Sequence, residues 1–504
     1  MIQKNKKMTL SKSLYTRGIQ CPKSLWLKKY KKEVLTPPDA TALARFETGD
    51  VVGDLACGLF PHGKEVVYNP DDFAGMVETT KKLMDKGFEH IYEANFLYDG
   101  IIVLVDILKV TPDGVEIYEA KSSTSVKDIY LHDVSIQRYV LKELGYSVVG
   151  SYVVHIDNSY VRGEELDLDG FFKIVDVSEE VDALELGIPK KLEEFKAYLA
   201  DDEPNIDIGA HCNTPYECDA KEYCWRVQRS IPDYSIFNIF NLGSKKQLEL
   251  YTQGIVNIED IPDDFAMTAI QKQKVQNYKS QSTSIDKESI KTFLETLTYP
   301  IYHLDFETFQ QAIPEWQGIS PYQQIPFQYS LHIEHSDGEL EHFEYLAQDA
   351  KDPRYELAKS LVKDIPKDAT VLAYNMSFEK GVISKLAESF SELEEHLLSL
   401  NENMRDLMSP FQKKHYLTPK MQGSYSIKYV LPALVPKMQE AYKSLEGIQN
   451  GSDAMNAFAK LSLMSEDEKE KTRTALLAYC KLDTLAMVEI LKKLRVEIEK
   501  ESLL

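Results

Sequence analysis

Hydrophobic and polar positions in the first 150 residues alternate with periods that predict helices and strands. Apolar residues recur at helical spacing in residues 11–30, 40–59 and 131–145. Between the last two of these stretches, residues 100–110 and 115–121 place Val, Ile, Leu and Tyr in alternation with polar residues. A Pro-Asp-Gly turn joins the two runs, so we expect helices followed by a β-hairpin and a further helix.

The pattern changes after residue 229. Short apolar stretches in residues 230–283 alternate with stretches rich in Lys and Gln, which predicts small helices joined by Gly-containing turns. We interpret residues 230–290 as a helical connector, with a helix-hairpin-helix-like module as the alternative.

The last part of the chain combines strands with helices. Residues 299–306 and 370–374 are apolar runs typical of buried strands, and residues 327–334 show the alternation of an amphipathic strand. A helix is expected over residues 355–362, and a charged helix begins near Ser465. Because strands and helices are interleaved, this part is expected to form an α/β domain.

Length and composition indicate several packed domains. The 504 residues exceed one ordinary core, and 43% of them are hydrophobic. We therefore divide the chain into residues 1–229, 230–290 and 291–504. The N-terminus is polar and basic, and no run of eighteen apolar residues occurs, so we expect a cytoplasmic protein without a membrane partner.

The formal net charge of −22 opposes a nucleic-acid partner, because phosphate binding needs Lys and Arg. The charge is uneven, however, since residues 4–32 contain ten Lys or Arg and no Asp or Glu. Sites for hard cations also concentrate carboxylates. Nucleic acid therefore stays a candidate partner.

Acidic residues in the last block occur at spacings that bring them together. Asp305 and Glu307 are separated by one residue on a predicted strand, so both side chains point from one face. Such carboxylates repel each other unless Mg²⁺ or Mn²⁺ lies between them, although a strand end with two solvated acids is the alternative. Glu379 follows the next buried strand. Tyr479 and Asp483 share one face of a helix at a spacing of four residues.

This set resembles the DEDD family of 3′–5′ exonucleases, which have an RNase H-like fold. The resemblance implies that Asp305, Glu307 and Asp483 hold two divalent metals. It also implies that Tyr479 orients the attacking water of phosphodiester hydrolysis. The family has Asp where this chain has Glu379, whose longer side chain would then reach a metal-bound water.

The predicted hairpin carries a second polar set. Asp106 lies on its first strand, and Glu119 and Lys121 share one face of its second strand. Surface acids and a Lys on a polar strand face are the alternative. The set resembles PD-(D/E)XK nucleases of the RecB type, which implies that Asp106 and Glu119 bind metal and that Lys121 stabilises the attacking water. Gln137 corresponds to a Gln on a later helix of that family.

The sequence departs from the RecB-type pattern at two places. Family members show a His after a Gly on an early helix, whereas residues 49–53 are Gly-Asp-Val-Val-Gly. They also carry Gln-x-x-x-Tyr on the later helix, whereas this chain has Gln137-Arg-Tyr139. These departures motivate the hypothesis that the N-terminal site is weaker or degenerate.

Four cysteines bracket the first block, with Cys21 before the hairpin and Cys212, Cys218 and Cys224 after it. In a reducing compartment such a cluster indicates metal ligation or redox chemistry. RecB-type nucleases with an iron–sulfur cluster have this arrangement, which implies that the four thiolates hold a 4Fe-4S cluster. Zinc is the alternative, although its frequent Cys-x-x-Cys pairs do not occur in the sequence.

The remaining cysteines, Cys57 and Cys480, are expected to be small core residues. Three aromatic residues near the cysteine cluster, Trp26, Tyr223 and Trp225, are candidates for stacking on bases. Packing around the cluster is the alternative role for all three.

Across nearly its whole length, the chain resembles a bacterial family of uncharacterised proteins. In that family an iron–sulfur RecB-type nuclease domain, akin to the CRISPR-associated exonucleases, is fused to an RNase H-like exonuclease domain. The stretches that carry the resemblance are Tyr-His-Leu-Asp-Phe-Glu-Thr from residue 302, Pro-Phe-Gln-Tyr-Ser-Leu-His from 326, Ala-Tyr-Asn-Met-Ser-Phe-Glu from 373 and Ser-Tyr-Ser-Ile-Lys-Tyr-Val-Leu-Pro from 424.

The resemblance implies an α/β multidomain protein with a PD-(D/E)XK restriction-endonuclease-like domain, a helical connector and an RNase H-like domain. The expected function is metal-dependent, exonucleolytic hydrolysis of DNA, with Mg²⁺ or Mn²⁺ and a 4Fe-4S cluster as cofactors. One alternative is a nucleic-acid-binding scaffold with one or both sites degenerate. Another is an RNA-processing exonuclease, since DEDD enzymes act on both RNA and DNA.

Overall fold

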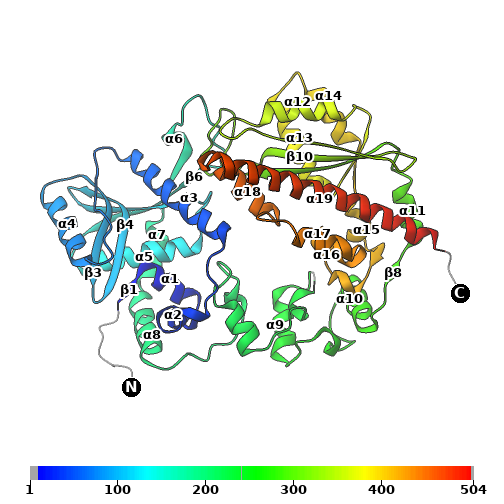
Figure 1. The fold of residues 1–504 in the computed structure, drawn as a ribbon. Helices are drawn as coiled ribbons and strands as arrows, with labels where there is room; N and C mark the ends of the chain where they lie inside the picture. Colours follow the sequence, from blue (N-terminus) through cyan, green and yellow to red (C-terminus); the bar gives the residue numbers. More distant parts are fainter. Residues whose placement is uncertain (1–8, 240, 501–504) are drawn as a thin grey trace. The chain divides into compact units, whose positions relative to one another are not determined.

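The computed structural model describes residues 9–239 and 241–500, which form two compact units (Figure 1). Unit 1 contains the described residues up to Ser230 together with Gln311–Tyr322. Unit 2 contains Ile231–Gln310 and the described residues from Gln323 onward, so the stretch interpreted as a connector is counted within it. Each unit combines a sheet with helices, which confirms an α/β multidomain chain.

Unit 1 is built around a seven-stranded mixed sheet. Its strands are β1 (Leu10–Ser11), β2 (Lys64–Glu65), β3 (His90–Tyr98), β4 (Ile101–Thr111), β5 (Gly114–Lys121), β6 (Val148–Ile156) and β7 (Phe172–Asp176). They follow the order β2-β3-β4-β5-β6-β7, with β1 paired to β4. The antiparallel pairing of β4 with β5 confirms the predicted hairpin, and β6 returns parallel to β5 after an intervening helix.

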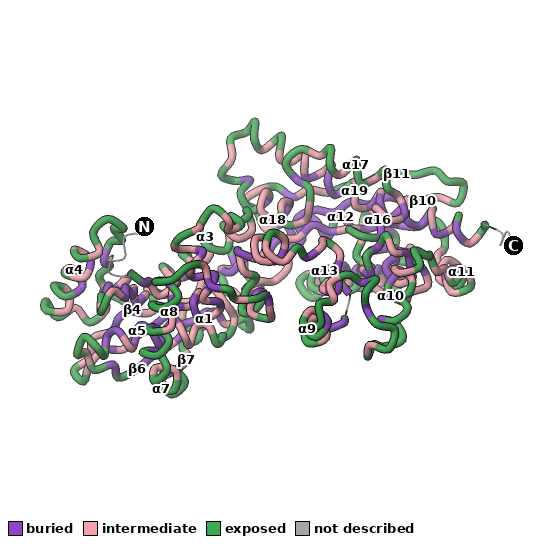
Figure 2. The backbone as a smooth tube through the Cα atoms, turned by 90° about the horizontal axis from the view of Figure 1, so that it is seen from below, coloured by how far each residue is buried: buried purple, intermediate pink, exposed green. Residues whose placement is uncertain are grey.

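Helices cover this sheet and close its core. They are α1 (Lys12–Gln20), α2 (Pro22–Tyr30), α3 (Ala40–Ala56), α4 (Phe73–Asp85), α5 (Asp128–Glu143), α6 (Leu168–Phe171), α7 (Ser178–Glu185) and α8 (Ile188–Ala200). Val134 and Val140 of α5 pack in one core with Ile117 of β5, and Phe195 of α8 joins them. Figure 2 shows buried segments along β4 and α5.

The helical stretch predicted over residues 11–30 is confirmed, but the chain divides it into two helices with Cys21 between them. Cys21 has an extended backbone with φ of −161°. The following Pro22 disfavours the helical conformation at Cys21 and then begins α2, where no partner is needed for its nitrogen. Cys21 therefore lies at a helix junction.

Unit 2 contains a five-stranded mixed sheet and a separate two-stranded ribbon. The strands of the sheet are β9 (Ile301–Phe309), β10 (Ile325–Glu334), β11 (Leu340–Leu346), β12 (Thr370–Ala373) and β13 (Met404–Asp406). The ribbon pairs β8 (Ser284–Ile285) with β14 (Tyr416–Leu417). In the sheet, the order is β11-β10-β9-β12-β13, with β9 antiparallel to β10 and parallel to β12.

The helices of unit 2 are α9 (Ser244–Thr252), α10 (Ala269–Ser280), α11 (Lys287–Leu294), α12 (Arg354–Asp364), α13 (Met376–Ser389), α14 (Glu394–Glu402), α15 (Ser409–Gln412), α16 (Ile427–Leu434), α17 (Pro436–Lys443), α18 (Gly451–Lys460) and α19 (Glu466–Glu499). The longest, α19, runs along the sheet (Figure 1). It begins as predicted, because Ser465 and Glu468 form a capping box.

The strand predicted over residues 327–334 is confirmed as part of β10, but its predicted amphipathic character is wrong, since every residue of β10 is buried. Tyr329 and Leu331 pack in the core that contains Leu357 of α12. On the opposite face, Gln328 Nε2 donates to Leu476 O of α19 at 2.9 Å. The polar positions of β10 therefore bond to a helix and do not face solvent.

Among residues 9–239 and 241–500, no helix is both long and apolar enough to cross a membrane.

Candidate active sites

The C-terminal acids lie on three elements of unit 2, which bring them close enough for Asp483, Glu307 and Glu379 all to affect Asp305. Asp305 and Glu307 are on β9, Glu379 is in the first turn of α13, and Asp483 is on α19. Cross-strand register places Asp305 beside Ser330, whose hydroxyl bonds to α19, so both β9 acids share the face that α19 covers. The sheet and its helices thus bring together the acids predicted from the sequence.

The pKa of each of these acids is raised. Burial is the main cause, and the charge of Asp483 adds to it, so the pKa values of Asp305 and Glu307 lie well above their ordinary range. Burial also raises the pKa of Glu379 to about 8 and that of Asp483 to about 6. Lys428 is a nearby cation that lowers the pKa of Asp483. Such crowding of carboxylates is typical of a site for a hard divalent cation.

The side chain of Glu379 is a second indication that the C-terminal acids form a cation site. Only 3% of its surface is exposed, and its Oε2 has no hydrogen-bond partner within the described part of the chain. A buried carboxylate oxygen without a partner is costly. The departure from Asp at this position therefore leaves an acceptor that is suited to bind a metal or a metal-bound water.

Two tyrosines hold Asp483. Tyr479, one turn earlier on α19, is 8% exposed, and its hydroxyl is close enough to Asp483 to lower the pKa of that carboxyl. Tyr442 of α17 donates to Asp483 Oδ1 at 2.6 Å, and its ring centroid lies 6.2 Å from that of Tyr479. Burial raises the pKa of both phenols, so both stay protonated donors. The sequence gives no signal for Tyr442, because only packing brings α17 to α19.

Cys480 is buried, as expected of a core residue, but it also lies beside the acids. Its Sγ and carboxylate oxygens of Asp305 and Glu307 lie within 4.8 Å of one another. In the described ranges, no other group of three or more His, Cys, Asp or Glu ligand atoms is as close. The interpretation of Cys480 as an ordinary core residue is therefore incomplete.

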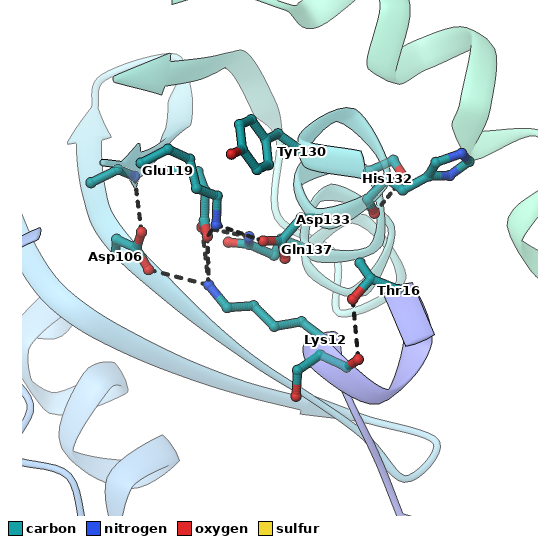
Figure 3. Close-up of polar contacts among 12 residues, drawn as sticks. Lys12, Thr16, Asp106, Glu119, Tyr130, His132, Asp133 and Gln137 are labelled. Atoms are coloured by element: carbon teal, nitrogen blue, oxygen red, sulfur yellow. Dashed lines mark hydrogen bonds and ion pairs between the residues drawn. The ribbon is translucent and has the colours of Figure 1, made fainter. Parts of the chain in front are cut away.

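The N-terminal set also comes together, on adjacent strands and α5 (Figure 3). Lys121 Nζ lies 2.6 Å from Glu119 Oε1 and 2.8 Å from Asp133 Oδ2. Gln137 Nε2 donates to Glu119 Oε2 at 2.7 Å, and Asp106 Oδ2 accepts the backbone N–H of Ala120 at 2.9 Å. The predicted residues therefore form one network, to which Asp133 adds an acid that the sequence analysis missed.

Lys12 occupies the position between the two predicted metal ligands of this network. Its Nζ lies 3.2 Å from Asp106 Oδ1 and 2.9 and 3.0 Å from the two carboxylate oxygens of Glu119 (Figure 3). Burial works against the charge of Lys12, but the neighbouring carboxylates hold its pKa well above the usual value. The ammonium group thus bridges the acids as a divalent cation would.

A further acid faces this site from β3. Glu93 lies between Tyr92 and Ala94, whose partners on β4 are Ile107 and Val105, the two neighbours of Asp106. Burial and the charge of Asp106 raise the pKa of Glu93 to about 7. Because the relation is cross-strand, sequence spacing gives no signal for it. Tyr139, by contrast, packs 6.4 Å from Tyr98 in the core of unit 1, so it adds nothing to the acid network.

Replacing Lys12 with Met should strengthen binding of Mn²⁺ to the N-terminal acids by about tenfold or more, because the competing ammonium is removed. Isothermal titration calorimetry in an Asp305→Asn background measures this, with the exposed Lys191→Met as control. Unchanged or weaker Mn²⁺ binding in Lys12→Met would show that Lys12 does not compete for the cation position.

The four clustered cysteines line one cavity, although they come from distant segments. Cys21 enters it from the α1–α2 junction, and Cys212, Cys218 and Cys224 enter from the chain after α8. Lys23 and His211 are among the other residues that line the cavity. The predicted ligand set is thus gathered in unit 1.

The three aromatic candidates beside the cysteines take part in internal contacts. Trp26 Nε1 donates to Asp201 O at 3.0 Å, and Tyr223 Oη accepts from Lys31 Nζ at 2.7 Å. Trp225 is 9% exposed. These contacts favour the packing role over base stacking for all three.

The fold and these residues define an α/β chain with a carboxylate-rich site on one sheet and a cysteine-lined cavity beside another. Residues 302–426, which include Asp305, Glu307 and Glu379, match a family described as a domain of unknown function (DUF2779). "Uncharacterized protein UU173" of Ureaplasma parvum serovar 3 is 24% identical over 305 residues. That alignment covers 56% of this chain and 44% of the relative, so the chain spans less than half of the relative's length. No solved structure matches.

Proposed function

We propose that this chain is a metal-dependent nuclease that hydrolyses phosphodiester bonds of DNA, with the C-terminal acids as its catalytic centre. The observation that carries the proposal is the convergence of Asp305, Glu307, Glu379 and Asp483 from three elements, with the pKa of each raised. Crowded carboxylates of this kind are stable in ionised form when divalent cations lie between them.

Each residue of the C-terminal site has a role in this proposal. Asp305, Glu307 and Asp483 would hold Mg²⁺ or Mn²⁺, which when bound stabilises negative charge on the reacting phosphate and activates water. Glu379 offers its unpartnered oxygen to a metal or metal-bound water. Tyr479 stays protonated and can donate to the attacking water, while Tyr442 fixes the orientation of Asp483.

The topology is compatible with the two folds that the sequence resemblances imply. In unit 2, a central β9 flanked by antiparallel β10 and parallel β12 supports the RNase H-like assignment. In unit 1, the β4–β5 hairpin, the crossing α5 and the parallel β6 support the PD-(D/E)XK assignment.

We propose that the cysteine cavity holds a 4Fe-4S cluster and not zinc. Tetrahedral zinc with bonds of 2.3 Å to sulfur would bring its four ligand sulfurs to about 3.8 Å from one another. Within the described residues, no three cysteine sulfurs lie within 4.8 Å of one another. In a 4Fe-4S cluster each thiolate binds a different iron, so the sulfurs are further apart.

Anaerobically purified protein should be brown and contain iron and sulfide, and Cys218→Ser should lose most of that visible absorption. Absorption spectra with iron and zinc analysis check this, and Cys57→Ser serves as control because Cys57 does not line the cavity. A colourless protein with stoichiometric zinc would overturn the cluster assignment.

The nuclease proposal is tested by incubating the protein with labelled single-stranded DNA, double-stranded DNA and single-stranded RNA, with Mg²⁺, Mn²⁺ or EDTA. Shortening of DNA that requires the metal is expected. Shortening of RNA alone would replace the DNA proposal with the RNA-processing alternative. No shortening of any strand would favour the scaffold alternative, which the bridging Lys12 already supports for the N-terminal site.

A further inference from the structure

A row of cationic and aromatic side chains lies beside the N-terminal acid network. Lys127 directly precedes α5, Tyr130 is in the first turn of α5, and Tyr216 lies in the loop between Cys212 and Cys218. Lys127 Nζ is 5.8 Å from the ring centroid of Tyr130 and 5.5 Å from that of Tyr216. The two phenol oxygens are 3.4 Å apart. One ammonium group is therefore shared by two rings.

The row is continuous with the acid network. Lys121 Nζ, which pairs with Glu119, lies 5.4 Å from the ring centroid of Tyr130. Tyr130 stands beside this network in Figure 3. The order of groups is thus Lys121, Tyr130, Lys127 and Tyr216, in which cations alternate with rings.

The outer part of the row is exposed and yet fixed in place. Tyr216 is 48% exposed, and Lys127 is exposed as well. Gln20 Nε2 of α1 donates to the carbonyl oxygens of His211 and Tyr216 at 2.9 and 2.8 Å, which ties this loop to α1. A large ring held open to solvent by backbone contacts is preorganised to bind a ligand.

Alternating rings and ammonium groups match the alternation of bases and phosphates in a single strand. Bases stack on aromatic faces with little dependence on sequence, and Lys binds the phosphates between them. A duplex keeps its bases paired and stacked internally, so it offers no base face to these rings. Lys121 and Lys127 supply positive charge at this surface, although the net charge of the chain is −22.

We infer that Lys127, Tyr130 and Tyr216 form a binding surface for single-stranded nucleic acid, which leads to the N-terminal acid network. This inference rests on the proposed function in one respect, namely that the ligand is a nucleic acid. It also gives the cysteine-bearing loop a role in binding, because Tyr216 lies between two of the cysteines.

The test is fluorescence anisotropy of a labelled oligothymidylate, with EDTA present so that strand hydrolysis cannot interfere. Tyr216→Ala should weaken binding by roughly 5- to 100-fold, as loss of one base stack does. Tyr216→Phe should bind as the wild type does, since it keeps the ring. Lys127→Gln should reduce the salt dependence of binding by about 0.7 in the log–log slope.

Folding of the variants is checked by melting temperature and by the visible spectrum of the cysteine site. Equal binding by wild type, Tyr216→Ala and Lys127→Gln would overturn the inference. Tighter binding of a duplex than of the single strand would do so too, as would variant-sensitive binding of poly-glutamate but not of the oligonucleotide. Because the assay omits metal, variant-sensitive binding without any hydrolysis in the metal assays would overturn the nuclease proposal alone.

Discussion

Replacing Asp305 with Asn is expected to reduce metal-dependent strand hydrolysis by about 10²–10³-fold, while leaving the fold intact. Asn has nearly the same size and can occupy the same position on β9. It lacks the negative charge that would hold a divalent cation beside Glu307 and Asp483. Without the stabilising charge of the metal, the activation free energy of hydrolysis rises by several kcal/mol. A rise of that size lowers the rate by about 10²–10³-fold.

The rate of nucleotide release from a labelled single strand measures this effect in saturating Mn²⁺. Glu339→Gln is the matched control, because Glu339 lies in the exposed turn before β11. Glu119→Gln in the N-terminal network should retain most of the activity. Full activity in Asp305→Asn, together with loss of activity in Glu119→Gln, would place the reaction at the other site.

The metal-free protein is expected to lose stability as the pH rises. The pKa of Glu379 rises from 4.5 to about 8 and that of Asp483 from 3.8 to about 6, mainly because of burial. The folded state therefore binds more protons than the unfolded state between these values, and stability falls as the pH rises through them. One pKa unit corresponds to about 1.4 kcal/mol, so these two acids together account for a loss on the order of 5 kcal/mol between about pH 5 and about pH 8.

Thermal unfolding in EDTA, followed by circular dichroism at about pH 5 and about pH 8, measures this loss. Saturating Mn²⁺ should restore most of the stability at the higher pH, because a bound cation favours the ionised acids. Glu379→Gln should weaken the pH dependence without metal, since Gln does not titrate. A melting temperature in EDTA that rises across this interval would contradict the account.

Sequence periodicity predicts which residues share a face when they belong to the same strand or helix. Asp305 and Glu307 share a face because they are two apart on a strand, and Tyr479 and Asp483 because they are four apart on a helix. The β4–β5 hairpin was predictable from its turn and alternation.

Contacts between residues on different elements could not be predicted from periodicity, because only tertiary packing brings those elements together. Tyr442 reaches Asp483 from another helix, and Glu93 meets Asp106 across strands. Lys12 lies 94 residues before Asp106 in a basic segment, where one Lys looks like any other. The full burial of β10 was missed because its polar side chains bond to α19, a partner that periodicity does not show.

The central claim is that the C-terminal acids form a divalent-metal site at which a strand is cut. The most direct measurement is anomalous X-ray diffraction from crystals grown with Mn²⁺ and a single-stranded oligonucleotide. The account predicts Mn²⁺ density between Asp305, Glu307 and Asp483, in contact with a phosphate of the strand. Mn²⁺ density at other positions only, with these three acids bound to no metal, would contradict it.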